Sequence, residues 1–344
     1  MAIAKRPLGR TGLTVTTLGF GGAPLSGFRA SVTERQGVDT LLAAYANGVR
    51  YFDTAPLYGF GRSEHIFGQA LRTLDRDNFV LSSKVGRWMS PKPDNEDVPG
   101  WRKGGLSFKP TFDYSRDGTL RSLEQSLLRL GLNRIDIVHI HDVDVWTHGT
   151  QGAADQRFKE TMAGCFPALA ELRSAGIIKA IGVGLNESAM SLRFVREADV
   201  DCVMLAGRYT LLEQGALDDL LPVCEQKGVS ILTAGPFNSG ILATGAVPGA
   251  LYNYQPAPIP IMDRVRLLEG VCQRHNVDLA TAALQFPLAH PSVVSMVAGG
   301  ISPDEVGQNA ARMSVRIPAA FWSELKKQGL ITPSAAVPSD TAHT

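Results

Sequence analysis

Polar side chains stand at the ends of several short apolar runs in this sequence of 344 residues. Asp53, Lys84, His141 and Asn186 each lie at or just beyond the end of a run rich in β-branched residues. Carboxylate, amine and imidazole groups are the ones that enzymes use to move protons when they are gathered at one place. If the runs are parallel strands, their carboxyl ends meet at one edge, and the sequence predicts an active site there.

The runs recur eight times, and a loop and a segment of helical period separate each run from the next. Eight alternating strands and helices suit a closed parallel barrel, so the sequence predicts an α/β fold of the (β/α)8 TIM-barrel type. A doubly wound sheet also alternates in this way, and the count alone does not separate the two. The runs cover residues 17–21, 50–53, 79–85, 135–141, 180–184, 202–205, 229–233 and 293–297.

The helical segments begin and end at recognisable residues. Thr33 with Gln36 predicts a capped helix that Gly48 ends, and Ser302 with Glu305 predicts another helix start. Asp142 and Asp144 follow the fourth run, and we interpret them as loop caps.

Three further segments complete the predicted organisation. Apolar residues on both sides of Gly9–Gly12 predict an N-terminal β-hairpin that could plug the barrel base. Residues 86–112 form a long loop after the third strand, which we interpret as a lid or binding loop, or else as disordered. Residues 1–332 then form a single domain, and the Pro- and Ser-rich tail at 333–344 is expected to be disordered.

Composition excludes several classes of function. A net charge of +1 and an ordinary 44% of hydrophobic residues give no indication of a basic surface that binds nucleic acid or a membrane. The four cysteines are scattered without a C-x-x-C pair, so we expect reduced thiols and no metal site. Without a signal-peptide pattern or an apolar span, we expect a cytoplasmic protein with a small-molecule substrate. Nothing in the sequence specifies an oligomeric state.

Six segments of the chain resemble the aldo-keto reductases, in the order in which that family carries them. The resemblance implies that Asp53, Tyr58, Lys84 and His141 form the family's proton-transfer tetrad. The segments are RPLGRTGLTVTTLGFGG, GVRYFDTAPLYGFGRSEHIFGQAL, VLSSKVG, RIDIVHIHD, AIGVGLNE and VAGGISPDEVGQNAA.

The chemistry that the resemblance implies explains the four residue types. A phenol holds its proton too tightly to exchange it near neutral pH, and a neighbouring cation lowers the phenol pKa. Lys84 would act in this way on Tyr58, and Asp53 would hold the ammonium group in place. His141 would hydrogen-bond the substrate oxygen and orient the substrate.

The resemblance also implies a nicotinamide cofactor, NAD or NADP, although the sequence contains no G-x-G-x-x-G motif of a Rossmann domain. Asn186 would bind the carboxamide, Tyr209 would stack on the nicotinamide, and the loop after the seventh run would line the pyrophosphate. The start of the final helix would hold the adenosine half of the cofactor. The implied contacts are Gly21, Gly22, Asn186, Tyr209, Pro236, Ser239, Gly240, Gly299, Gly300, Ser302, Glu305, Gln308 and Asn309.

Three positions depart from the common family pattern, and together they favour NAD while leaving NADP open. Ala206 stands where many members carry a glutamine that helps to hold the carboxamide. Ile301 and Glu305 stand at or near positions where members that prefer NADP place Lys or Arg.

The resemblance is strongest to bacterial NAD-linked aldose 1-dehydrogenases of the L-fucose or D-threo-aldose type and to pyridoxal 4-dehydrogenases. These enzymes oxidise a cyclic hemiacetal carbon to a lactone. His141, Trp88 and Trp101 would then contact the substrate, the tryptophans by stacking on a sugar ring. The alternatives are a pyridoxal 4-dehydrogenase, an NADPH-dependent aldehyde or ketone reductase, and a non-catalytic subunit of the kind found beside ion channels.

Overall fold

The computed structural model describes residues 3–27, 30–98 and 104–339, and its centre is a closed barrel of eight parallel strands. The barrel confirms the predicted (β/α)8 fold, and every strand coincides closely with one of the eight predicted runs. The strands are β3 (Leu18–Gly21), β4 (Tyr51–Asp53), β5 (Val80–Val85), β8 (Ile137–His141), β9 (Ala180–Leu185), β10 (Cys202–Ala206), β11 (Ser230–Ala234) and β14 (Val293–Gly299).

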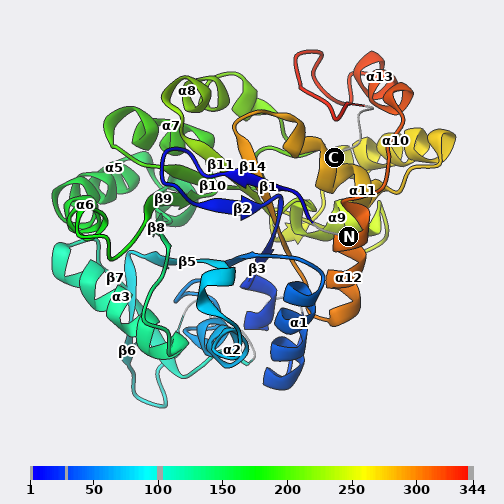
Figure 1. Cartoon of the computed structure of the whole chain (residues 1–344). Coiled ribbons are helices and arrows are strands. Elements are labelled where there is room, and N and C mark those ends of the chain that lie inside the picture. The colour runs from blue at the N-terminus through cyan, green and yellow to red at the C-terminus, as the bar shows by residue number, and fades with distance from the viewer. Residues whose placement is uncertain (1–2, 28–29, 99–103, 340–344) are drawn as a thin grey trace.

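Helices surround the barrel on its outer side (Figure 1). Both faces of the strands are therefore covered, and β5 and β9 are buried along their whole length. The helices are α1 (Glu34–Ala46), α2 (Arg62–Leu71), α3 (Arg116–Leu130), α4 (Val145–His148), α5 (Gln151–Glu160), α6 (Phe166–Ser174), α7 (Ser188–Glu197), α8 (Leu220–Lys227), α9 (Ile241–Thr244), α10 (Ile259–His275), α11 (Leu279–Gln285), α12 (Pro303–Arg312) and α13 (Ala319–Lys327).

The predicted caps are present where the sequence places them. The Thr33 side chain accepts a hydrogen bond from the Gln36 N–H at the start of α1, and Ser302 accepts from Glu305 N–H at the start of α12. The first helix runs to Ala46, next to the predicted stop at Gly48, which has a φ of 93°. Local side-chain chemistry thus sets where these helices begin.

The predicted N-terminal hairpin is formed by β1 (Lys5–Pro7) and β2 (Thr14–Thr16), which lie across one end of the barrel (Figure 1). Leu8 and Val15 are fully buried and pack with residues from inside the barrel, among them Tyr51. The hairpin therefore covers the base of the barrel, opposite the carboxyl ends of the strands.

The long loop after the third barrel strand contains an antiparallel ribbon of β6 (Arg87–Pro91) and β7 (Phe108–Phe112). The ribbon is held on α3, where Gln125 accepts a hydrogen bond from Met89 N–H at 2.9 Å. A second, short hairpin of β12 (Leu251–Tyr252) and β13 (Gln255–Pro256) follows β11.

The predicted disordered tail begins at residue 333, and its first residues lie against the barrel. Ala335 is 1% exposed, and Val337 packs on the main core. Among the described helices, none has the length and apolar character that a membrane crossing requires.

Candidate active site

Asp53 and Lys84 form a buried ion pair at the carboxyl ends of β4 and β5. The Lys84 ammonium lies 2.6 Å and 2.8 Å from the two carboxylate oxygens and also donates to the Thr54 carbonyl at 2.9 Å. Ser82 donates to Asp53 Oδ1 at 2.7 Å. Burial raises the pKa of Asp53, and the charge of Lys84 opposes that rise. The carboxylate therefore fixes the ammonium at the bottom of the site.

Tyr58 lies above this pair, in the loop between β4 and α2. The Lys84 Nζ is 5.0 Å from the centroid of its ring, and the His141 ring meets it edge-on at 6.1 Å between centroids. The next three residues all have left-handed backbone, including Phe60 with a φ of 53°. A non-glycine residue in this conformation stores strain, as is common beside active sites. The sharp turn aims the phenol at the barrel mouth.

The residues that follow Tyr58 in the GRSE segment fix this turn to the barrel. The Ser63 N–H donates to the Tyr58 carbonyl at 3.1 Å, and the Ser63 hydroxyl donates to the Gly22 carbonyl. Glu64 is fully buried, where it accepts from Ser83 and pairs with Arg129 at 2.6 Å. The GRSE segment thus holds the tyrosine in place.

His141 and His139 lie on one face of β8, as their alternation predicts. Both are buried, and burial together with the charge of Lys84 lowers the pKa of each imidazole well below its usual range. Neither ring nitrogen of His139 has a hydrogen-bond partner within the part of the chain that the structure describes. The lowered pKa favours the neutral form of both imidazoles, with His141 at the carboxyl end of β8 and His139 one layer deeper in the barrel.

The pKa of the Tyr58 phenol differs from the sequence-based expectation. Burial raises this pKa well above its ordinary value, and the negative charges of Asp53 and Asp142 raise it further. Arg87 is the cation that opposes this rise, and the expected lowering by Lys84, which is paired with Asp53, does not prevail. The raised pKa favours the protonated phenol in the free protein.

The predicted cofactor glycines lie where β3 and β14 end side by side. Gly21 pairs with Gly299 across the two strands. A Cβ at Gly22 would lie 2.5 Å from the Ser63 hydroxyl, and one at Gly299 would lie 2.4 Å from Pro24. Gly300 is less crowded, with Val306 nearest at 3.1 Å. Close packing of the chain is sufficient to explain the glycines at 22 and 299.

Asn186 and Tyr209 differ in their access to a ligand. The Asn186 backbone is fixed by Asp144 and Arg208, and its side-chain amide makes no hydrogen bond to any described residue. Tyr209 is 0% exposed and packs on Phe286 and His290, so its ring offers no face to a nicotinamide. The packing of Tyr209 inside the protein argues against the stacking on a nicotinamide that the resemblance implies.

The predicted pyrophosphate residues Pro236, Ser239 and Gly240 follow β11 in a loop with left-handed backbone at 238–240. Ser239 Oγ accepts a hydrogen bond from Tyr254 N–H at 2.9 Å. Asn238, which sequence reasoning missed, donates to the Gly207 carbonyl and accepts from Thr210. Its buried amide joins the loops after β10 and β11. The N–H groups of such a loop suit an anionic group.

The last group of predicted residues lies at the start of α12. Ser302 caps the helix, and Glu305 is exposed and accepts from Ile301 N–H at 3.0 Å. Gln308 is exposed on the same helix, whereas Asn309 is buried and accepts from Arg312. Free N–H groups in the first turn of a helix suit a phosphate or ribose.

Trp88 lies apart from the tetrad. It donates to Asp113 at 3.2 Å, and the Arg121 guanidinium lies 3.6 Å above its ring, on the side of α3. Trp101 belongs to 99–103, outside the described residues. Arg87, one position before Trp88, has the opposite orientation and forms an ion pair with Asp142 at 2.8 Å. The charged residue, not the tryptophan, therefore reaches the site.

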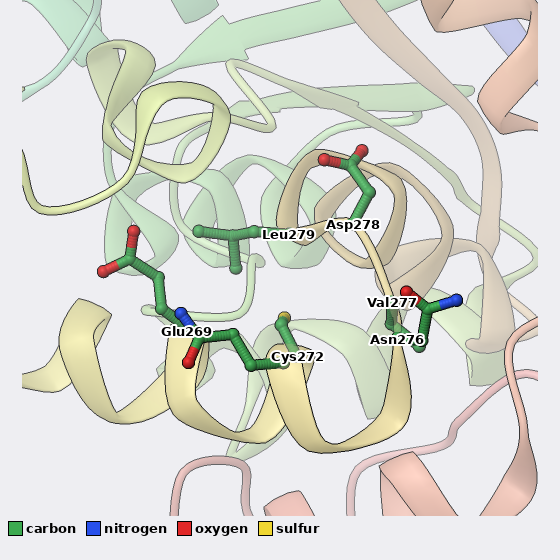
Figure 2. A pocket seen from close by; sticks show the side chains of 7 residues that line it. Glu269, Cys272, Asn276, Val277, Asp278 and Leu279 are labelled. Atoms are coloured by element: carbon green, nitrogen blue, oxygen red, sulfur yellow. The ribbon is translucent and has the colours of Figure 1, made fainter.

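A separate hollow lies in the outer helical layer between the end of α10 and the start of α11 (Figure 2). It contains no member of the tetrad, so it does not serve the chemistry described above. Its lining residues are Glu269, Cys272, Gln273, Asn276, Val277, Asp278 and Leu279.

Comparisons with known proteins identify the family to which the chain belongs. Residues 17–329 match the model of the family described as "Aldo/keto reductase family". A pyridoxal 4-dehydrogenase from Microbacterium luteolum is 42% identical over 341 residues, which cover 96% of this chain and 99% of that protein. A D-threo-aldose 1-dehydrogenase from a Pseudomonas species is 38% identical over 331 residues, covering 93% and 96%. Among solved structures, the holo form of an aldo-keto reductase from Bacillus halodurans superposes with a TM-score of 0.75 at 25% identity, covering 98% of each chain.

Proposed function

The chain belongs to the aldo/keto reductase family and is an oxidoreductase, and from that premise we propose that it oxidises the hemiacetal carbon of a small cyclic sugar to a lactone. The observation that carries the proposal is the placement of Tyr58 between the Asp53–Lys84 pair and His141. The similarity to a D-threo-aldose 1-dehydrogenase supports a sugar as the substrate.

Each tetrad residue has a distinct task in this reaction. His141 donates a hydrogen bond to the hydroxyl oxygen of the reacting carbon and positions it against the Tyr58 hydroxyl. The Tyr58 oxygen, as phenolate, accepts the proton of that hydroxyl group. Lys84 stabilises the phenolate while Asp53 holds the ammonium in place. Desolvation raises the pKa of the Tyr58 phenol, so this proton transfer is favoured at alkaline pH.

A nicotinamide cofactor fits the residues at the barrel mouth. Asn186 offers an amide without a partner among the described residues, and the first turn of α12 offers backbone N–H groups. The loop at 238–240 has the backbone curvature that suits a pyrophosphate. The cofactor would supply the hydride acceptor. Glu305 and Asp304, both exposed in the first turn of α12, favour NAD over NADP because they repel a 2′-phosphate.

A second candidate substrate is pyridoxal, which the 42% identity to a pyridoxal 4-dehydrogenase favours. The reaction is of the same class, because a cyclic hemiacetal is again oxidised to a lactone. An NADPH-dependent aldehyde or ketone reductase on the same scaffold is the remaining alternative, and it would run the proton transfer in the opposite direction.

One panel of assays separates these functions. The purified protein is incubated with NAD⁺ and either L-fucose, D-arabinose, L-galactose or pyridoxal, and NADH formation is followed. The same protein is tested with NADPH and simple aldehydes. We expect NADH with at least one sugar. NADH with pyridoxal alone would establish the second candidate, and NADPH consumption without any NADH formation would establish a reductase.

A further inference from the structure

A buried ion pair between Arg87 and Asp142 lies next to His141 of the tetrad. We propose that this pair recognises the substrate, and that the Asp142 carboxylate accepts a hydrogen bond from a hydroxyl group on the carbon next to the reacting carbon. The inference rests on the proposed oxidation of a cyclic sugar. It specifies the substrate class as sugars that carry this second hydroxyl.

The Asp142 carboxylate is fixed beside the catalytic imidazole. Its Oδ1 lies 3.4 Å from Nε2 of His141, and its Oδ2 lies 2.8 Å from Arg87 Nη1. The Tyr114 hydroxyl donates to the carbonyls of both His141 and Asp142, at 2.7 Å and 3.2 Å. The Asp142 N–H donates to the Gly184 carbonyl at 3.1 Å. These hydrogen bonds fix the backbone of Asp142, and the contacts with Arg87 and His141 orient its carboxylate.

The ion pair has hydrogen-bonding capacity that the protein does not use. Arg87 is 6% exposed and Asp142 is 7% exposed. Within the described ranges, no hydrogen bond reaches either carboxylate oxygen, and Arg87 Nη1, although 2.8 Å from Oδ2, is not aligned to donate one. The other side of the guanidinium lies over the Phe112 ring at 4.1 Å. A buried charge without hydrogen bonds raises the free energy of the folded protein. A polar ligand that supplies the missing hydrogen bonds offsets this cost.

The position of the carboxylate specifies which group it binds. The oxygen of the reacting carbon must meet both His141 and Tyr58. A carboxylate 3.4 Å from the same imidazole nitrogen is therefore within reach of the next polar group on the substrate. Because an ionised carboxylate only accepts hydrogen bonds, it selects a donor such as a hydroxyl group. A simple aldehyde, which lacks that hydroxyl, leaves Asp142 unpaired.

A purely structural pair would behave differently. Arg87 begins the β6–β7 ribbon and Asp142 follows β8, so the pair also joins the ribbon to the barrel. If joining were its whole contribution, loss of the Asp142 charge would lower activity on every substrate by the same factor. If the pair recognises a hydroxyl, the loss falls on substrates that carry it.

The test compares D-arabinose with 2-deoxy-D-ribose, which has hydrogen in place of the hydroxyl at C2 and is otherwise the same sugar. With NAD⁺, we expect the wild-type protein to prefer D-arabinose in kcat/KM by at least ~10-fold, the usual worth of a charge-assisted hydrogen bond. Asp142→Asn, which keeps the size of the side chain, should lose at least ~10-fold on D-arabinose and less than about 3-fold on 2-deoxy-D-ribose. Glu96→Gln is the matched control, because it breaks the ion pair of Glu96 with Lys109 of β7, which is more exposed than the Arg87–Asp142 pair.

The outcomes are distinguishable. Equal wild-type activity on the two sugars overturns the proposal and leaves the sugar dehydrogenase function intact. An equal loss on both sugars in Asp142→Asn also overturns it, in favour of a structural pair. If the wild-type protein oxidises neither sugar but turns over pyridoxal or simple aldehydes, the proposed function itself fails, and this proposal with it.

Discussion

Gly182 makes the space that His139 fills. A Cβ at Gly182 would lie 2.1 Å from Nδ1 of the histidine, on the neighbouring strand of the barrel. The imidazole therefore occupies the space that a side chain at position 182 would take. Gly184, two residues on, faces Lys84 and His141 at the ordinary distances of 3.6 Å and 3.7 Å.

This contact predicts a difference between two glycine substitutions. Gly182→Ala should destabilise the protein by about 1–3 kcal/mol, because the methyl group overlaps a ring that is closed in on all sides. Gly184→Ala should cost less, since its methyl group meets no atom closer than 3.6 Å. Urea unfolding of both variants measures the difference. Equal costs would show that the ring of His139 moves away freely.

The same histidine predicts an acid-dependent loss of stability. Its folded-state pKa is lowered by burial and by Lys84, whereas in the unfolded chain it titrates near 6.5. Below pH ~6.5 the unfolded chain binds a proton at this histidine, and the folded core disfavours that proton. The free energy of unfolding is therefore highest above pH ~6.5 and falls as the pH drops below it. Between pH 7.5 and 5.5, the wild-type protein should lose about 1 kcal/mol more than His139→Gln.

Urea unfolding at the two pH values measures this effect, with His65→Gln as the control because His65 is exposed. If His139→Gln loses as much stability on acidification as the wild-type protein, the buried imidazole is not the group that titrates.

The raised pKa of Tyr58 predicts an alkaline rise in the oxidation rate. In the proposed oxidation only the phenolate accepts the substrate proton, and its population grows up to about tenfold per pH unit below the pKa. Turnover in the oxidative direction should therefore still be rising at pH 9. In Asp142→Asn the rise should move to lower pH, because one of the charges that raise this pKa is gone. A profile that is flat above pH 7 in both proteins would contradict this assignment.

The start of α12 predicts the cofactor preference. NAD should be favoured over NADP by at least ~10-fold in kcat/KM, which requires only about 1.4 kcal/mol. Glu305 is exposed there, and Arg312 is paired with Asp278 at 2.9 Å. Glu305→Gln removes the charge and keeps an oxygen that accepts from Ile301 N–H. This variant should raise kcat/KM with NADP and so reduce the preference for NAD. Tighter binding of NADPH to the wild-type protein would contradict the prediction.

Sequence alone is sufficient to predict the strands, the basal hairpin and the helix caps, because each rests on a local pattern or on a repeat. It does not predict which ribbon residue faces the site. A shift of one residue reverses the faces of a strand, so the choice between Arg87 and Trp88 depends on how the ribbon packs on α3. Asp144 caps α4 as expected, accepting from Thr147 N–H, whereas Asp142 does not cap a helix and pairs with Arg87. The burial of Tyr209 likewise depends on neighbours that are distant in sequence, Phe286 and His290.

Tyr58 is the proposed proton carrier of the reaction, and the Tyr58→Phe variant isolates this role. The substitution removes one oxygen atom and keeps the ring that meets His141 edge-on. We expect unchanged folding and cofactor binding, with turnover reduced at least ~100-fold in either direction. The measurement is kcat beside a cofactor titration on the same preparation. A loss of that size with intact cofactor binding is the predicted result, and near wild-type turnover would contradict it.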